Sequence, residues 1–305
     1  MQNIITYIKK PKTLGLAILS HFGTWLPDSL YLKIMFRLKM GYKLNLKKPQ
    51  TFNEKLQWLK LYNRKPEYTQ MVDKSGAKTI AENILGKGYV IPTLGVWDKF
   101  EDIDFNSLPD RFVLKTTNGG GGGGVIICRD KSKLNLVSAA EQLKSSLKAS
   151  IYRNLKEWPY KNVKPRILAE KFMVDESGEL RDYKFYCFNG DPKVFLVASE
   201  RFSRHRTYFD YFDMDGNHLP FTQGGMNNPV TPALPSTFEE MKQVATKLSH
   251  GLPHVRIDLY SVDEKVYFGE FTFFDSSGFE KFTPREWDNV FGNWLKLPTT
   301  SKERD

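Results

Sequence analysis

Phe112-Val113-Leu114-Lys115 opens the stretch that decides the fold, and six consecutive glycines, Gly119 to Gly124, follow it closely. The run Val125-Ile126-Ile127-Cys128 comes directly after the glycines. Apolar residues on both sides are typical of β-strands, because a flexible linker normally has polar flanks. A glycine run costs backbone entropy when it is ordered, so a folded protein keeps one where bare backbone must approach something. Its N–H groups form a cradle for anions, and Lys115 would add a cation. The sequence therefore predicts a phosphate-binding loop, with a linker as the alternative.

The overall composition is that of a soluble globular protein. The chain has 305 residues, of which 26% are charged and 40% hydrophobic. This length is enough for two or three lobes rather than one. The formal charge of +10 fits an anionic partner, which could be a nucleotide, an acidic sugar, a nucleic acid or an anionic membrane face. A basic protein without such a partner is the alternative that charge alone leaves open.

Cysteine usage and hydropathy indicate the compartment. The two cysteines, Cys128 and Cys187, both lie in apolar strand-like runs, and no spacing suggests a metal site or a disulfide framework. A reducing compartment, the cytoplasm, is therefore expected. No segment reaches the roughly 18 apolar residues of a spanning helix, and we expect no signal peptide.

Residues 13–26 could still bring a cytoplasmic protein into contact with a membrane. The stretch is fairly apolar and is preceded by Lys9, Lys10 and Lys12. A basic flank beside an amphipathic stretch can lie on an anionic membrane surface, here the inner face of the membrane. A helix docked on the rest of the protein is the alternative, and we favour it.

The pattern of elements predicts an α+β fold. Residues 1–70 have helical spacing, Thr51 to Glu54 have the form of a capping box, and residues 73–86 form a helix that ends at Gly86. Strands are expected at 166–174, 183–188 and 193–198, a helix at 237–248, and a hairpin from 255–260 and 266–274. We therefore expect a helical region at 1–70, a small mixed lobe at 71–165 and a larger sheet-rich lobe at 166–305.

The last hairpin carries candidate metal ligands. Strand alternation in 255–260 buries the apolar residues and places Arg256 and Asp258 together on the opposite face. Glu270 and Thr272 share a face in the same way. Two carboxylates on paired strands suit Mg²⁺, which takes oxygen ligands and substrate phosphates. The alternative is an ion pair between Arg256 and Glu270, and the upstream glycine loop favours the metal.

Two further groups of polar residues could bind a nucleotide or an acceptor. Glu170 and Lys171 close an apolar run, where Glu170 could read an adenine, and Asp182 could accept hydrogen bonds from a ribose. Arg201, Arg204, His205 and Arg206 could hold an acidic acceptor, because arginine matches carboxylate geometry. Solvated surface charges are the alternative for both groups.

Asp213-Met214-Asp215 has the form of a sugar-nucleotide metal motif. It lies at the Asp215-Gly216 turn, so we favour a purely structural role in that turn.

The order of these motifs resembles the ATP-grasp superfamily, and most closely its TupA-like (teichuronopeptide biosynthesis) branch, over roughly residues 45 to 297. The resemblance depends on runs that share an order and spacing: Phe52-Asn53-Glu54-Lys55-Leu56-Gln57-Trp58, Asp73-Lys74, Phe112-Val113-Leu114-Lys115, Glu170-Lys171, Asp182-Tyr183-Lys184-Phe185, Arg256-Ile257-Asp258-Leu259-Tyr260, Gly269-Glu270-Phe271-Thr272-Phe273 and Gly278-Phe279-Glu280-Lys281-Phe282-Thr283-Pro284. It implies an ATP-grasp fold, in which two α+β lobes clasp ATP, preceded here by a helical N-terminal region.

The resemblance also implies a role for each matching residue. Residues expected to contact ATP are Lys74, Lys115, Gly119, Gly120, Gly121, Gly122, Gly123, Gly124, Glu170, Lys171 and Asp182. Lys184 and Arg256 are expected near the reacting phosphates, and Asp258, Glu270 and Thr272 near Mg²⁺. Residues expected to contact the acceptor are Arg201, Arg204, Arg206, Ser276, Ser277 and Gly278.

This sequence departs from the family pattern in three places. Many ATP-grasp ligases have asparagine where this chain has Thr272, which weakens the case for a third metal ligand. Relatives often carry serine or histidine within the glycine loop, whereas here all six residues are glycine. The first 50 residues do not resemble the usual α/β opening domain, so acceptor binding there does not carry over.

The function that the resemblance implies is an ATP- and Mg²⁺-dependent carboxylate–amine ligase. It would form an amide through an acylphosphate, joining an amino acid to an acidic sugar in bacterial cell-surface polysaccharide biosynthesis. One rival is a glycosyltransferase of the same pathway, which would use Asp213 and Asp215. The other is a basic nucleic-acid or membrane-surface module without catalysis, ranked last because no aromatic–basic signature occurs. We expect no nucleic-acid partner, and the sequence does not indicate an oligomeric state.

Overall fold

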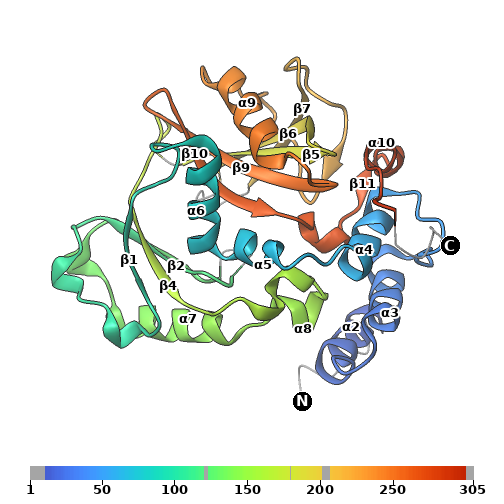
Figure 1. Ribbon diagram of the computed structural model, residues 1–305, viewed down its shortest axis with the longest axis horizontal. Helices are drawn as coiled ribbons and strands as arrows, with labels where there is room; N and C mark the ends of the chain where they lie inside the picture. The colour runs from blue at the N-terminus through green and yellow to red at the C-terminus, as the bar shows by residue number, and fades with distance from the viewer. Residues whose placement is uncertain (1–10, 120–122, 179, 201–206, 300–305) are drawn as a thin grey trace.

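The computed structural model describes residues 11–119, 123–178, 180–200 and 207–299. The chain begins with a run of helices and continues into two antiparallel sheets (Figure 1). The first helices are α2 (Pro11–Phe22), α3 (Asp28–Met40), α4 (Phe52–Tyr62), α5 (Glu67–Val72) and α6 (Lys74–Leu85). In the described residues no helix has the length and apolar character needed to cross a membrane. The expected α+β fold with a helical start is confirmed.

Local sequence signals set the limits of these helices. The Thr51 side chain accepts from the Glu54 backbone N–H, and the Glu54 side chain accepts from the backbone N–H of Thr51, so the predicted capping box is present. Asp73 caps α6 by accepting from the N–H groups of Ser75 and Gly76. This cap fixes the start of the helix that carries Lys74.

A four-stranded sheet contains the glycine run. Its strands, in spatial order, are β1 (Thr93–Trp97), β4 (Ile167–Lys171), β2 (Phe112–Thr116) and β3 (Val125–Cys128), all antiparallel. The glycines connect β2 to β3, and the Thr116 N–H donates to the Gly124 carbonyl at 2.9 Å. Helix α7 (Leu136–Lys148) packs its buried Ala139 and Leu143 into the core of this sheet. Short α8 (Ile151–Leu155) follows.

The expected boundary between residues 165 and 166 falls just before β4. Because β4 pairs with both β1 and β2, the four-stranded sheet continues past that boundary. Strand order depends on contacts between distant segments, which the local pattern does not specify.

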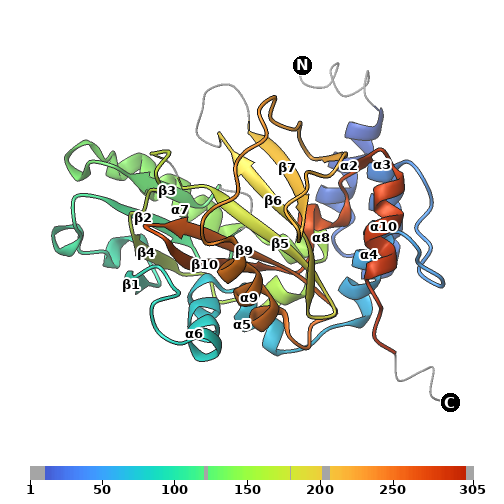
Figure 2. The same cartoon turned by 90° about the horizontal axis from the view of Figure 1, so that it is seen from above.

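The larger sheet has five antiparallel strands. In spatial order they are β10 (Lys265–Thr272), β9 (His254–Val262), β5 (Asp182–Phe188), β6 (Asp191–Ser199) and β7 (Tyr208–Asp213). The turn between β5 and β6 uses Asn189 and Gly190, with φ of 54° and 84°, as their Asn-Gly sequence predicts. Helix α9 (Phe238–Ser249) covers one face of the sheet (Figure 2).

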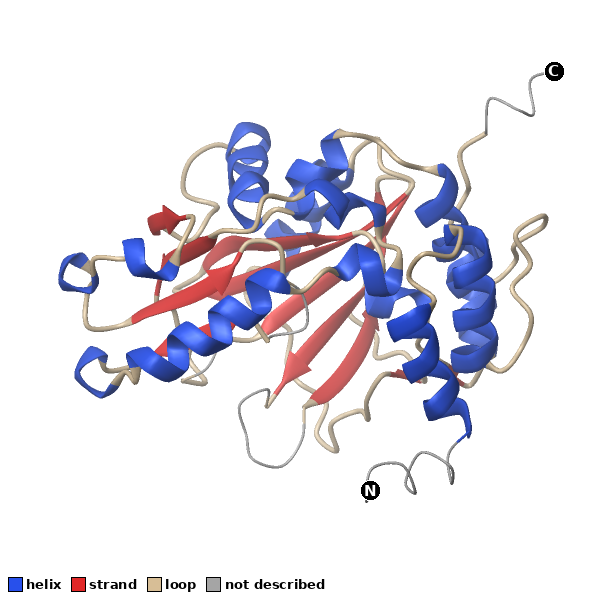
Figure 3. Cartoon of the chain, turned by 90° about the horizontal axis from the view of Figure 1, so that it is seen from below, coloured by secondary structure: helices blue, strands red, loops and turns tan. Residues whose placement is uncertain are grey.

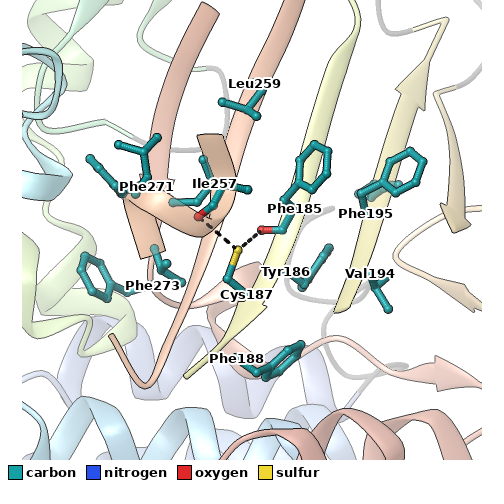
Figure 4. Packing of buried hydrophobic residues seen from close by; sticks show 14 of the residues in the cluster. Phe185, Tyr186, Cys187, Phe188, Val194, Phe195, Ile257, Leu259, Phe271 and Phe273 are labelled. Atoms are coloured by element: carbon teal, nitrogen blue, oxygen red, sulfur yellow. Dashed lines mark hydrogen bonds between the residues drawn. The ribbon is translucent and has the colours of Figure 1, made fainter. Parts of the chain in front are cut away.

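Aromatic side chains fill the core beneath α9. Phe185 and Phe195 stack with ring centroids 5.4 Å apart. Cys187 is buried among them, and its Sγ donates to the Phe185 carbonyl (Figure 4). Burial raises the pKa of Cys187 to about 12, so it is an inert core residue.

Helix α4 belongs to the main core although it lies in the N-terminal region. Its Phe52 contacts the rings of Phe188 and Phe291, the latter on α10 (Glu286–Trp294). Lys55 on α4 donates to the carbonyls of Gly292 and Leu295 at 2.7 and 2.8 Å. Figure 3 shows the N-terminal helices gathered at one end of the sheets. A short pair, β8 (Thr222–Gln223) and β11 (Phe282–Thr283), completes the fold.

Candidate active site

A cleft of about 390 Å³ is lined by residues from both sheets. Its apolar part is formed by Ile91, Val113, Val125, Ile127, Phe172, Met173, Val174 and Leu180. Its polar part contains many of the residues that the sequence singled out: Lys74, Lys115, Gly119, Gly124, Glu170, Lys171, Asp182, Lys184, Arg256, Asp258 and Glu270. Residues far apart in the chain therefore converge on one volume.

Both described ends of the glycine run pack against one pair of hydroxyl groups. The Oγ atoms of Thr116 and Ser146 are hydrogen-bonded at 2.8 Å. A Cβ on Gly124 would lie 2.2 Å from the Thr116 Oγ1, and one on Gly119 would lie 2.6 Å from the same atom. A Cβ on Gly123 would meet nothing within 4 Å in the part of the chain that the structure describes. Glycine is thus required sterically where the run joins the sheet.

Part of the predicted set cannot be placed. Gly120, Gly121 and Gly122 lie outside the described residues, and so do Arg201, Arg204 and Arg206. Their predicted roles in binding ATP and the acceptor therefore stay predictions.

The two carboxylates of the last hairpin are neighbours across the strands. Glu270 is directly opposite Asp258, although Phe268 is opposite Leu259, so Gly269 is an extra residue in a β-bulge. The bulge turns Glu270 to the cleft face while Phe268 stays in the core. A Cβ on Gly269 would lie 2.9 Å from the Tyr260 ring, which favours glycine there.

Each of these carboxylates is paired with a lysine. Lys74 Nζ lies 2.8 Å from Glu270 Oε2. Lys184 pairs with Asp258 and lies 3.1 Å from Asp182. Burial by itself would raise the pKa of Glu270, but the charges of Lys74 and Lys184 lower that pKa far below its usual range. Glu270 is therefore an anion at any physiological pH.

Glu170 is held by two cations. Lys115 on β2 lies 2.6 Å from its Oε2, and Lys78 on α6 lies 2.5 Å from its Oε1. Burial opposes the charge on Glu170, yet the two lysines lower its pKa to about 2. Its predicted contact with adenine stays a prediction, because both oxygens are engaged by lysines here.

Arg256 is surrounded by acceptors. Its Nε and Nη2 donate to the two oxygens of Asp258 at 2.7 and 2.8 Å, and Nη2 also donates to Thr272 Oγ1 at 3.2 Å. Nη1 pairs with Asp275. Burial would lower the pKa of Arg256, but Asp258 and Asp275 raise it well above its usual value. The alternative pairing with Glu270 is also present, at 4.0 Å.

The segment after β10 forms a turn of three consecutive left-handed residues. Ser276, Ser277 and Gly278 have φ of 45°, 56° and 64°. A Cβ on Gly278 would lie 2.4 Å from Gln57 Nε2, so the close approach of α4 requires glycine. Ser276 is exposed, whereas Ser277 and Gly278 are buried. Their predicted contact with the acceptor stays a prediction.

Helix α4 holds this turn in place. Gln57 Nε2 donates to the carbonyls of Ser277 and Gly278 at 3.0 and 2.8 Å. Lys60 Nζ donates to the carbonyls of Ser277 and Leu155 at 2.8 and 2.9 Å. The same turn positions Asp275, which forms an ion pair with Arg256.

Lys78 and Asp275 were missed by the sequence reasoning. Lys78 lies four residues after Lys74 on α6, a spacing that places both on one helix face and could have revealed it. Asp275 lies in an irregular turn without periodicity, and its sequence context gives no such signal.

Asp213 has a structural role in its turn. Its Oδ1 accepts from the N–H groups of Asp215 and Asn217 at 3.0 and 2.8 Å, and its Oδ2 accepts from Asn217 Nδ2 at 2.9 Å. The favoured interpretation of this motif as turn chemistry therefore agrees with its contacts.

The donor set of the cleft fits a magnesium ion held jointly with phosphate. Asp258 and Glu270 provide carboxylate oxygens, the ligand type that Mg²⁺ prefers. Among the described residues no group of three or more His, Cys, Asp or Glu side chains is arranged to hold a metal. Thr272 directs its hydroxyl to Arg256 instead. Two carboxylates suit an ion that completes its coordination with substrate oxygens and water.

Solved structures show distant likenesses to this chain. The chain resembles D-alanine–D-alanine ligase from Bacillus anthracis complexed with ATP at 16% identity and a TM-score of 0.39, covering 66% of this chain and 53% of that one. The Helicobacter pylori D-alanine–D-alanine ligase is 14% identical with a TM-score of 0.42, and the match covers 75% of this chain and 60% of that one. N5-carboxyaminoimidazole ribonucleotide synthetase in its ADP complex is 14% identical with a TM-score of 0.43, and the match covers 67% of this chain and 45% of that one. The chain thus spans about half of these solved proteins.

No curated protein matches the chain. These structural likenesses are distant, and the assignment rests on a family model instead. The model described as TupA-like ATPgrasp matches residues 54–296, which is most of the sequence and includes both sheets. The chain belongs to the TupA-like ATP-grasp family.

Proposed function

We propose that this protein is an ATP- and Mg²⁺-dependent carboxylate–amine ligase. We further propose that it joins an amino acid to an acidic sugar in bacterial cell-surface polysaccharide biosynthesis. One observation carries the proposal: six cations and two cross-strand carboxylates line a single cleft, together with both described ends of a glycine run. The cations are Lys74, Lys115, Arg129, Lys171, Lys184 and Arg256.

The pairing of charges supports a nucleotide as the occupant. Lys74 is paired with Glu270, and Lys184 with Asp258. A metal-bound triphosphate can exchange partners with these pairs, because the carboxylates can turn to the metal and the lysines to the phosphates. Every charge then keeps an opposite charge beside it, which avoids the cost of an unpaired buried ion.

The proposed reaction is the one that membership of the ATP-grasp family implies. A substrate carboxylate oxygen forms a bond to the γ-phosphorus, and the bond from that phosphorus to ADP breaks, which yields an acylphosphate. An amine then attacks the acyl carbon, loses a proton, and inorganic phosphate leaves. Magnesium, when bound, would neutralise phosphate charge and hold the phosphate oxygens in place.

The residues of the chain supply alignment and charge compensation. Lys74, Lys115 and Lys184 would reduce the repulsion between the incoming carboxylate and the triphosphate. Arg256 would contact the transferring group, and its pairs with Asp258 and Asp275 hold its side chain in the cleft. The glycine run would supply backbone N–H donors and help to exclude water.

An ADP-release assay tests the proposal. The protein is incubated with ATP, Mg²⁺ and pooled uronic acids with pooled amino acids, and ADP is measured with and without each pool. We expect ADP formation that requires both pools, and its loss in Glu270→Ala. Glu82→Ala is the matched control, because Glu82 is exposed on α6 and lies outside the cleft lining. If wild type releases no more ADP than Glu270→Ala with any pool, the ligase proposal fails.

The identity of the product tests the second part of the proposal, that an amino acid is joined to an acidic sugar. Mass spectrometry of the same reaction should reveal an amide that joins an amino acid to a uronic acid. An amide between two amino acids would retain the ligase and reject the acidic sugar as acceptor.

A further inference from the structure

We infer that helices α2 and α3 carry a surface that binds an anionic lipid membrane. The surface consists of six large apolar side chains, called here the α2–α3 face. Their exposed fractions are Leu14 37%, Ile18 51%, Phe22 65%, Trp25 80%, Leu30 45% and Ile34 37%.

Docking of α2 on α3 leaves these side chains free. Leu19 is buried in a cluster with α3, and Leu16 packs against the same cluster. Gly15 lies close to the Leu38 side chain, so the two helices approach each other tightly. The favoured expectation of a docked helix is therefore met, but docking uses only one side of α2. The other side is also apolar, although the solvent side of a surface helix is normally polar.

The exposed residues of α2 form one stripe. Leu14, Ile18 and Phe22 are spaced by four residues and therefore lie on one side of the helix, and Trp25 follows in the connection between α2 and α3. On α3, Leu30 and Ile34 have the same spacing. Aromatic rings at the end of an apolar stripe are typical of a surface that sits at the boundary between lipid headgroups and acyl chains.

Positive charge is concentrated in the same part of the chain. The first 50 residues contain nine lysines and arginines and one acidic residue, Asp28, so they contribute +8 of the total charge of +10. Asp28 is directed inward, with Arg64 at 2.6 Å and Lys156 at 3.5 Å. Within residues 11–50, the side chains described as exposed and basic are Lys33, Arg37, Lys39, Lys43, Lys47 and Lys48.

The combination of apolar and basic groups selects the occupant. A second copy of this chain would bring the same positive charge to the contact and would be repelled. A nucleic acid would use the cations but has no need for exposed leucine and isoleucine side chains. An anionic bilayer uses both, since each basic residue near its surface adds attraction and each buried apolar side chain adds more. Figure 1 places α2 and α3 at the opposite end of the molecule from β1, so the bilayer would lie away from the four-stranded sheet.

Vesicle flotation with the full chain tests this inference. One set of vesicles contains only phosphatidylcholine, and the other contains about 30% phosphatidylglycerol. The test variant carries Ile18→Ser, Phe22→Ser and Trp25→Ser. The matched control carries Val137→Ser and Val230→Ser, because these residues are 71% and 76% exposed but lie elsewhere. Circular dichroism checks that both variants stay folded.

We expect wild type and the control to float with the anionic vesicles and to bind the neutral vesicles at least about tenfold more weakly. The triple variant should lose about tenfold or more of its binding to anionic vesicles. Raising the salt to about 0.5 M should weaken binding of the wild type, because it screens the basic residues.

Two results would overturn the inference. The first is a wild-type protein that does not float with anionic vesicles. The second is a triple variant that floats as well as the control. Analytical ultracentrifugation covers the alternative occupant, because self-association that the triple variant abolishes, without vesicle binding, would assign the face to a second copy. This test does not depend on ADP release, so it stands or fails separately from the proposed ligase activity.

Discussion

Replacing Gly124 by alanine should destabilise the four-stranded sheet, while the same change at Gly123 should not. A Cβ at position 124 would lie 2.2 Å from Thr116 Oγ1 and 2.3 Å from Ser146 Oγ, so the two hydroxyls must separate. Disrupting this half-buried hydrogen bond and overpacking the site each cost about 1 to 3 kcal/mol. Alanine recovers only about 0.4 to 1 kcal/mol of chain entropy. We therefore expect a net loss of about 2 to 4 kcal/mol.

Gly123 is the matched control within the same glycine run. Its added Cβ would meet no atom of the described residues within 4 Å. Alanine there should leave the free energy of unfolding unchanged or raise it by up to about 1 kcal/mol.

Urea unfolding followed by far-UV circular dichroism measures both variants. Amide hydrogen exchange of residues 112–116 reports the same region locally, because β2 pairs directly with the end of the run. A further comparison places Gly124→Ala in a chain with Thr116→Ala and Ser146→Ala, where the cost should fall below about 1 kcal/mol. Equal stability of the Gly124→Ala and Gly123→Ala proteins would refute the packing argument.

Three further predictions concern buried charges. The pKa of Glu170 falls from 4.5 to about 2, so its contribution of about 3 kcal/mol is present above pH 4.5 and is lost as the pH falls toward 2. Unfolding measured across that window should be less pH-dependent in Glu170→Gln, and an unchanged slope would contradict the pairing with Lys78 and Lys115. Burial lowers the pKa of His254 from 6.5 to about 3, so the folded protein cannot take up the proton that the unfolded chain binds, and stability should fall between pH 6.5 and 3. His254→Asn should flatten the part of this slope between pH 6.5 and 4.5, above the range of Glu170, and an unchanged slope there would assign it to other groups. Lys60→Met removes a buried donor from the carbonyls of Ser277 and Leu155, of which Ser277 keeps Gln57, and takes a cation away from the buried Glu157, so it should cost about 3 to 5 kcal/mol in urea unfolding. Adding Glu157→Gln should recover part of that loss. If it recovers none, the unpaired charge of Glu157 is not the cause of the loss.

The sequence predicted those features that local rules control. The capping box at Thr51, the turn at Asn189-Gly190 and the hairpin that carries Asp258 all follow from short-range patterns and are confirmed. The family assignment is also confirmed, because the order of many weak motifs is more specific than any one of them.

The remaining features depend on contacts between distant segments. The position of β4 between β1 and β2 is set by packing, and no signal in residues 166–174 specifies it. Both partners of Glu170 come from other elements, so its charge environment could not be read from its own run. The bulge at Gly269 did leave a trace, since the buried residues Phe268 and Phe271 are three apart where strict alternation requires two.

The support of the turn by α4 has a consequence for how this protein can be divided. Lys60 and Gln57 never line the cleft, yet they hold the backbone from which Asp275 reaches Arg256. A fragment that begins after residue 70 would retain every lysine and carboxylate predicted to meet ATP and would lack the helix that shapes this turn. The orientation of Arg256 thus depends on α4, which acts on it through the turn. The N-terminal region is therefore an integral part of the catalytic scaffold rather than a detachable extension.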